Sequence, residues 1–167
     1  DNIGTTVLNT TCNDTGGYAL YAIGFAGDEY GATDLSYTSL DGTTTNSNYN
    51  IPTGIATSGN TSNWSMKLSP VAGTTTDTIE NNYSSYSIVP DDYTKVATLN
   101  TVTDPGSSTA GSSVSTTYQA YISPTQPAGT YTGKVKYTLV HPSTAPKPLI
   151  PNIAKITYMQ DFAKFKV

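Results

Sequence analysis

The sequence predicts an all-β fold: an antiparallel β-sandwich of the immunoglobulin-like or jelly-roll type, with an extended C-terminal strand segment. Thr (30 residues) and Tyr (13) favour strands, and Gly (14) and Pro (10) favour the turns between them. Several segments alternate apolar and polar residues with period two, whereas heptads and long stripes of period 3.6 are absent. A chain of 167 residues has the length of a single domain.

Two strands are expected near the N-terminus, at residues 4–12 and 18–25. Five turn-forming residues separate them, which favours a hairpin. The second strand carries apolar groups on both faces and is therefore predicted to be central in its sheet. Residues 27–63 are rich in Gly, Thr, Ser and Asn, and are expected to form short strands and long loops.

Residues 64–68 alternate clearly, with Trp64, Met66 and Leu68 expected in the core. Ser65 and Lys67 fall on the opposite face and are expected to point outward. Further strands are expected around residues 88–89 and 96–99.

Two long alternating segments follow, at residues 114–122 and 130–141, and the tight connection at residues 124–129 predicts a second hairpin. In that connection Pro127 fixes φ, and Gly129 is expected to adopt a backbone conformation that other residues avoid. Tyr131 and Tyr137 are six residues apart and should share the core face, whereas Lys134 and Lys136 should face solvent.

The chain is divided into a sandwich at residues 1–141, a proline-rich linker at 142–151 and a C-terminal strand at 152–167. The last strand either completes its own sheet or is donated to a neighbouring subunit, and both alternatives stay open. The apolar residues expected to make this contact are Ile153, Ile156, Tyr158, Phe162 and Phe165.

Residues 126–140 (QPAGTYTGKVKYTLV) resemble the closing hairpin of repeated bacterial surface modules, including WxL-type cell-wall-binding domains. The chain is most similar to surface proteins of the Saccharibacteria type. In such modules an early Gly-Tyr-x-Leu strand (here residues 17–20) and a central Trp strand (here Trp64) precede a Pro-Ala-Gly-Thr-Tyr turn (here residues 127–131). The resemblance covers roughly residues 5–140 and implies an exported β-sandwich used in surface architecture or adhesion.

Charge and composition exclude several classes. The chain has a net charge of −4 and no Arg, so it is a poor candidate for binding nucleic acid. No apolar run is long enough to span a membrane, and no charged-then-apolar leader opens the chain. We expect an extracellular protein at the cell surface whose export signal has been removed. Cys12 is the only Cys and excludes a disulfide within the chain.

Catalysis is not expected. His141 is the only His and precedes the proline-rich linker, so a solvated position is expected. The adjacent acid pairs at residues 28–29 and 91–92 point apart on an extended chain, so neither forms a catalytic dyad. No cofactor or metal site is assigned, although acidic side chains leave calcium open as an alternative to simple turn formation. These side chains are Asp28, Glu29, Asp34, Asp91, Asp92 and Asp104.

The sequence offers candidate residues both for binding sugars and for being glycosylated. Tyr83, Tyr86 and Tyr93 form a candidate aromatic platform for sugars, and Tyr83 and Tyr86 lie near Asn81 and Asn82. Five sequons are candidates for glycosylation, at Asn9, Asn13, Asn60, Asn63 and Asn82.

The sequence therefore predicts a structural subunit of an extracellular filament (like a pilus or fimbria) or of a cell-surface layer, which assembles with copies of itself by β-strand addition. The alternative is a cell-surface adhesin or carbohydrate-binding module that recognises host-cell or cell-wall glycans.

Overall fold

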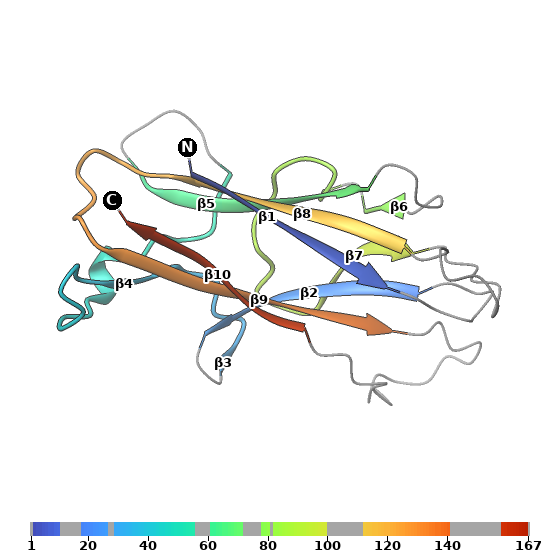
Figure 1. The fold of residues 1–167 in the computed structure, drawn as a ribbon, viewed down its shortest axis with the longest axis horizontal. Coiled ribbons are helices and arrows are strands. Elements are labelled where there is room, and N and C mark those ends of the chain that lie inside the picture. The colour runs from blue at the N-terminus through green and yellow to red at the C-terminus, as the bar shows by residue number, and fades with distance from the viewer. Residues whose placement is uncertain are drawn as a thin grey trace.

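The fold is an antiparallel β-sandwich, as predicted (Figure 1). The computed structural model describes residues 2–10, 18–26, 29–55, 61–71, 78–80, 82–99, 112–140 and 158–166. These ranges contain ten strands and one short 3-10 helix, η1 (Ser47–Tyr49). No helix in them is long and apolar enough to cross a bilayer.

The strands form two sheets, and every pair of hydrogen-bonded strands is antiparallel. The smaller sheet has the order β1-β8-β5, from β1 (Asn2–Thr10), β8 (Ser112–Tyr121) and β5 (Asn63–Pro70). The larger sheet has the order β10-β9-β2-β7-β6, from β10 (Tyr158–Lys166), β9 (Thr130–Val140), β2 (Tyr18–Ala26), β7 (Thr94–Leu99) and β6 (Thr78–Ile79). Two short strands extend the larger sheet: β3 (Glu29–Tyr30) pairs with β2, and β4 (Ser36–Thr38) pairs with β9.

Both predicted hairpins are wrong. The strands at the N-terminus fall in opposite sheets, because β1 pairs with β8 whereas β2 pairs with β9 and β7. β8 and β9 are likewise separated, and the connection at residues 122–129 crosses from one sheet to the other. Alternation identifies the buried residues of a strand, but two strands in facing sheets alternate just as two strands of a hairpin do.

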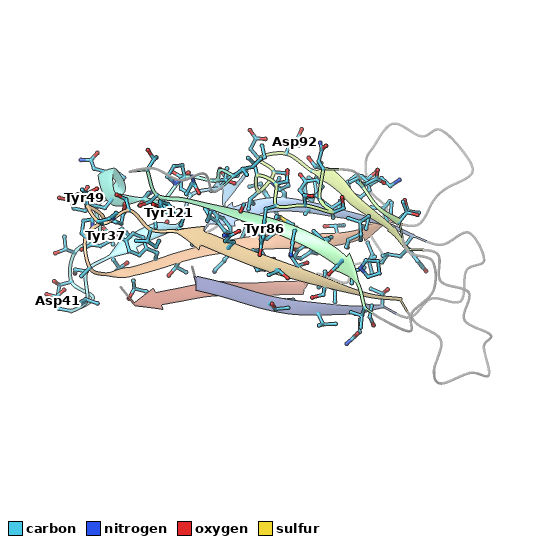
Figure 2. All side chains as sticks on the ribbon, turned by 90° about the horizontal axis from the view of Figure 1, so that it is seen from above. Tyr37, Asp41, Tyr49, Tyr86, Asp92 and Tyr121 are labelled. Atoms are coloured by element: carbon cyan, nitrogen blue, oxygen red, sulfur yellow. The ribbon has the colours of Figure 1, made fainter. Side chains whose placement is uncertain are left out.

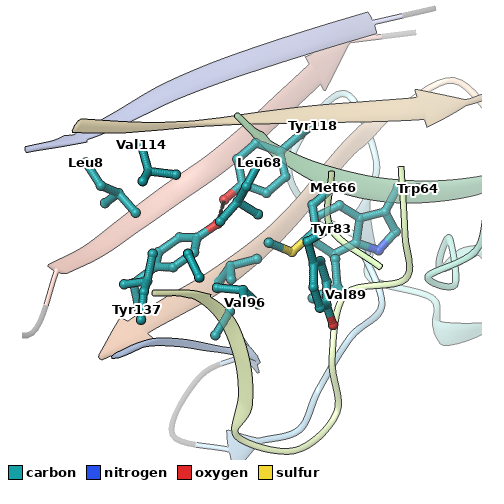
Figure 3. Close-up of a cluster of buried hydrophobic side chains, with 14 of the residues drawn as sticks. Leu8, Trp64, Met66, Leu68, Tyr83, Val89, Val96, Val114, Tyr118 and Tyr137 are labelled. Atoms are coloured by element: carbon teal, nitrogen blue, oxygen red, sulfur yellow. Dashed lines mark hydrogen bonds between the residues drawn. The ribbon is translucent and has the colours of Figure 1, made fainter. Parts of the chain in front are cut away.

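The core lies between the two sheets (Figure 3). Trp64, Met66 and Leu68 are buried, and so are Tyr131 and Tyr137, which confirms these sequence predictions. The predicted central strand is also confirmed, since β2 lies between β9 and β7 and buries residues of both faces. Other fully buried large side chains are Leu20, Leu35, Ile51, Val89, Val96, Leu99, Val114 and Tyr118.

A buried chain of hydroxyl groups links the two sheets. The hydroxyls of Tyr118 (β8) and Tyr137 (β9) are 2.6 Å apart, and Tyr137 also donates to Thr116 Oγ1 at 3.3 Å. Figure 3 shows the two Tyr side chains meeting end to end between the sheets. Because burial disfavours the phenolate, the pKa of Tyr137 is raised to about 12, and that of Tyr118 is raised well above its usual range.

Ser65 differs from its prediction. It is fully buried rather than exposed, and its Oγ has no hydrogen-bond partner among the described residues. β8 pairs along one edge of β5, and Thr53 and Ser87 form bridges along the other edge. Because β5 has backbone neighbours along both edges, solvent reaches this strand less than its alternating pattern predicts.

The Pro-Ala-Gly-Thr-Tyr turn is held by two Tyr hydroxyls. Tyr131 donates to Pro127 O at 2.6 Å, and Tyr37 donates to Ala128 O at 3.3 Å. Gly129 does not have the positive φ that we expected of it; in the described ranges that conformation belongs to Gly31 and Gly42. Gly129 is required by close approach instead, because a Cβ there would lie 2.2 Å from the Tyr37 ring and 2.7 Å from Thr38 O.

We therefore predict that Gly129→Ala destabilises the fold by about 1–3 kcal/mol, because the added methyl group forces apart a packed ring and a backbone carbonyl. Gly4→Ala is the matched control: nothing lies within 4 Å of its Cβ position, and its effect should stay within about 0.5 kcal/mol. Urea unfolding followed by circular dichroism measures both. Equal effects of the two substitutions would contradict the steric explanation.

The buried tyrosines predict a loss of stability in alkali. Their pKa values in the folded chain lie above the value of about 10 for an exposed Tyr, so the unfolded chain loses these protons first as pH rises. The stabilisation is complete below about pH 10 and declines as pH rises towards about 12. Urea midpoints measured across this range should fall, and they should fall less in Tyr137→Phe. The prediction fails if tyrosinate absorbance shows all 13 tyrosines ionising while the chain remains folded.

Candidate functional site

The C-terminal strand lies at the edge of the larger sheet. β10 pairs antiparallel with β9 of its own chain, from Tyr158 opposite Tyr137 to Lys166 opposite Thr130. β10 also approaches β1 of the smaller sheet (Figure 1). The opposite edge of β9 is occupied by β2 and β4, so the edge that receives β10 is the place where β9 can accept a further strand.

A bulge sets the register of this strand. Phe162 is the Cα partner of Gly133 and Phe165 that of Tyr131, so three steps on β10 match two steps on β9. β10 therefore contains one residue more than the matching stretch of β9, which is the definition of a β-bulge. The bulge gives both Phe residues partners at alternate positions of β9, where the residues are buried.

The predicted contact residues of this strand are only partly described. Tyr158, Phe162 and Phe165 lie in β10 and form backbone pairs with β9. Ile153 and Ile156 lie outside the described residues, and so does the proline-rich linker.

The predicted aromatic platform is not assembled. Tyr83 is 5% exposed and belongs to the core, so its ring cannot face a ligand (Figure 3). The cause is the path of the backbone: Leu68 N donates to Tyr83 O at 2.7 Å, which draws this segment along the edge of β5. Tyr86 is half-buried, with Lys67 Nζ 4.8 Å from its ring centroid, and it lies apart from Asp92, the neighbour of Tyr93 (Figure 2).

Tyr93 instead belongs to a cluster that the sequence analysis missed. We call Tyr30, Tyr93 and Lys136 the aromatic–lysine cluster. The two rings are 6.1 Å apart between centroids and tilted by 38°. Lys136 Nζ donates to the Tyr30 hydroxyl at 3.0 Å and lies 4.5 Å and 5.9 Å from the Tyr30 and Tyr93 ring centroids. The Tyr30 hydrogen bond is the largest contribution to a raised pKa of Lys136.

Three separate segments position this cluster. Tyr30 lies in β3, which pairs beside Phe25 of β2, and the two rings are 5.1 Å apart. After Tyr30 the chain turns at Gly31, whose N–H donates to Gly24 O at 2.9 Å. Gly31 has φ +86°, and a Cβ there would lie 2.7 Å from Asp91 O, so only Gly allows this approach.

The remaining contacts fix the other side of the cluster. Gly24 N donates to Pro90 O at 2.7 Å, and Asp92 Oδ1 accepts a hydrogen bond from Tyr93 N at 2.7 Å. The first bond joins the segment that carries Tyr93 to the edge of β2, and the second fixes the backbone within that segment.

The sequons differ in accessibility. Asn82 is exposed in a turn, and Asn9 is exposed on β1, where its Oδ1 accepts from Ser113 Oγ at 2.6 Å. Asn63 is half-buried on β5, and its Oδ1 is buried with no partner in the ranges that the structure covers. Asn13 and Asn60 lie outside those ranges.

No group of three or more metal-ligating side chains is found among the described residues. Asp41 is engaged in its own loop, where hydrogen bonds from Ser39 and Thr43 lower its pKa. Cys12, Asp28, Asp104 and His141 lie outside the part of the chain that is described.

Comparison of the chain with protein-family models, with characterised proteins and with solved structures finds no match.

The different environments of two Tyr residues can be measured. We predict that Tyr83→Ala costs about 3 kcal/mol or more, because it empties a core position. Tyr93→Ala, at a residue that is 44% exposed, should cost less than about 1 kcal/mol. Equilibrium unfolding in urea compares the two variants, and similar losses would contradict the burial described here.

Proposed function

We propose that the chain is a structural subunit of an extracellular filament or surface layer, which assembles by adding its C-terminal strand to the larger sheet of a neighbouring copy. The observation that carries the proposal is the place of β10. It is an edge strand of the larger sheet and, among the described strands, pairs through its backbone with β9 alone. Backbone pairing of this kind is equally available to the same strand from another copy.

The length of the preceding connection supports this exchange. Residues 141–157, which separate β9 from β10, number 17, whereas antiparallel neighbours commonly need only about 2–5 connecting residues. A chain of this length spans roughly 55 Å when extended, so it reaches well beyond its own β9. Four of its residues are Pro, which favours extended conformations.

Exchange of one strand per subunit gives open assemblies. Each copy offers one strand and one receiving edge, so head-to-tail contacts continue from copy to copy unless a rotation closes them into a ring. The role proposed is therefore scaffolding, performed by strand pairing between copies.

Cysteine crosslinking tests the proposal. Lys134 and Asp161 are Cα partners across β9 and β10, and neighbouring antiparallel strands bring such positions within disulfide range. In a Cys12→Ser background, chains with Lys134→Cys are mixed with chains with Asp161→Cys, assembled and oxidised. We expect disulfide-linked heterodimers on a non-reducing denaturing gel.

Two further samples complete the experiment. Lys166→Cys in place of Asp161→Cys is the control, because Lys166 pairs with Thr130 and lies out of register with position 134. Removal of residues 152–167 should abolish assembly. Fibres formed by the truncated chain would overturn the proposal. So would disulfides that form only within single chains when one chain carries both Lys134→Cys and Asp161→Cys.

A further inference from the structure

The aromatic–lysine cluster presents two large rings to solvent. Tyr30 is 53% exposed and Tyr93 is 44% exposed. Single exposed aromatic residues are common on protein surfaces, but these two lie side by side, and the ring of buried Phe25 lies 5.1 Å from that of Tyr30. β3, which carries Tyr30, projects from the larger sheet away from β5 and β8 (Figure 1). The rings therefore form a supported apolar surface on the outside of the sandwich.

Hydrogen-bond donors lie close to these rings: Lys136 Nζ lies over the Tyr30 ring, 4.5 Å from its centroid. The Tyr30 oxygen accepts from Lys136 Nζ, so the hydroxyl proton of Tyr30 remains a donor to other groups. The ammonium group has three N–H donors, and both Tyr30 and Tyr93 hydrogen-bond to it, so one N–H donor remains for another group. An N–H and an O–H donor about 3.0 Å apart suit the two oxygens of one carboxylate.

Charge adds selectivity. Lys136 is one of only eight basic residues in a chain of net charge −4, and Lys134 lies on the same face of β9. Asp92, which precedes Tyr93 in the chain, accepts the hydrogen bond of Tyr93 N with its carboxylate. A neutral sugar would contact the rings alone, whereas a sugar with a carboxylate also reaches the ammonium and hydroxyl donors.

We infer that the aromatic–lysine cluster binds carboxylated polysaccharides, with the sugar ring against Tyr93 and Tyr30 and the carboxylate at Lys136 Nζ and Tyr30 Oη. This binding is separate from the strand exchange proposed above. It gives the surface of each subunit a site for an acidic glycan, repeated along any assembly that the subunits form.

Affinity electrophoresis of the full chain tests this inference. Polygalacturonate is the probe, and its methyl ester is the matched ligand because it keeps the sugar backbone and blocks the carboxylate. We expect the chain to be retarded by polygalacturonate and at least about tenfold more weakly by the ester. Lys136→Gln should reduce affinity for the acid form about tenfold and leave the weak binding of the ester unchanged.

Substitutions of the two Tyr residues separate the contribution of the aromatic rings from that of the Tyr30 hydroxyl. Tyr93→Ala should weaken binding of both polymers, and Tyr30→Phe should weaken only that of the acid form, because it keeps the ring and removes the hydroxyl. Tyr49→Ala is the control, since Tyr49 is similarly exposed at 41% but packs against Tyr37, away from the cluster.

The inference is overturned if the unmodified chain is not retarded by polygalacturonate, or if the ester binds equally well. It is also overturned if Lys136→Gln and Tyr93→Ala bind like the unmodified chain. A change of oligomeric state in these variants, without a change of retardation, would assign the cluster to a contact between subunits instead.

Discussion

The hydroxyl contact between Tyr118 and Tyr137 constrains how the two sheets face each other. A core built with many Tyr residues must satisfy their polar ends, because a buried hydroxyl without a partner costs about 1–3 kcal/mol. Here the two hydroxyls, 2.6 Å apart, satisfy each other, and Thr116 adds a further partner. The contact requires β8 and β9 to lie opposite one another in different sheets. The crossing of the chain at residues 122–129 follows from the same requirement.

Local patterns predicted much of the fold and little of its topology. The burial of Trp64, Met66 and Leu68 follows from alternation, which depends only on the strand backbone. The sheet to which a strand belongs depends on contacts with distant segments, and no local pattern contains them. Ser65 illustrates the limit, because its burial arises from chain that runs along both edges of β5.

The same difference between local patterns and contacts of distant segments applies to the candidate sites. The C-terminal strand was found from sequence because its apolar residues and the prolines before it are local features. The aromatic–lysine cluster was missed because Tyr30, Tyr93 and Lys136 come from segments with no common spacing. Tyr83 was assigned to the surface because it follows two Asn residues, whereas backbone pairing with Leu68 places it inside. The glycine of the Pro-Ala-Gly-Thr-Tyr turn is explained by the ring of Tyr37, which is distant in sequence.

Trp64 gives the chain an internal optical reporter. It is the only Trp, it is 2% exposed, and its Nε1 donates to Thr33 O at 2.7 Å. Its ring is stacked with that of Tyr118, with centroids 6.2 Å apart. Excitation energy absorbed by Tyr118 is therefore readily transferred to the indole of Trp64. The emission of one fluorophore therefore reports on the space between the sheets, and separation of the sheets would shift it towards longer wavelengths as water reaches the indole.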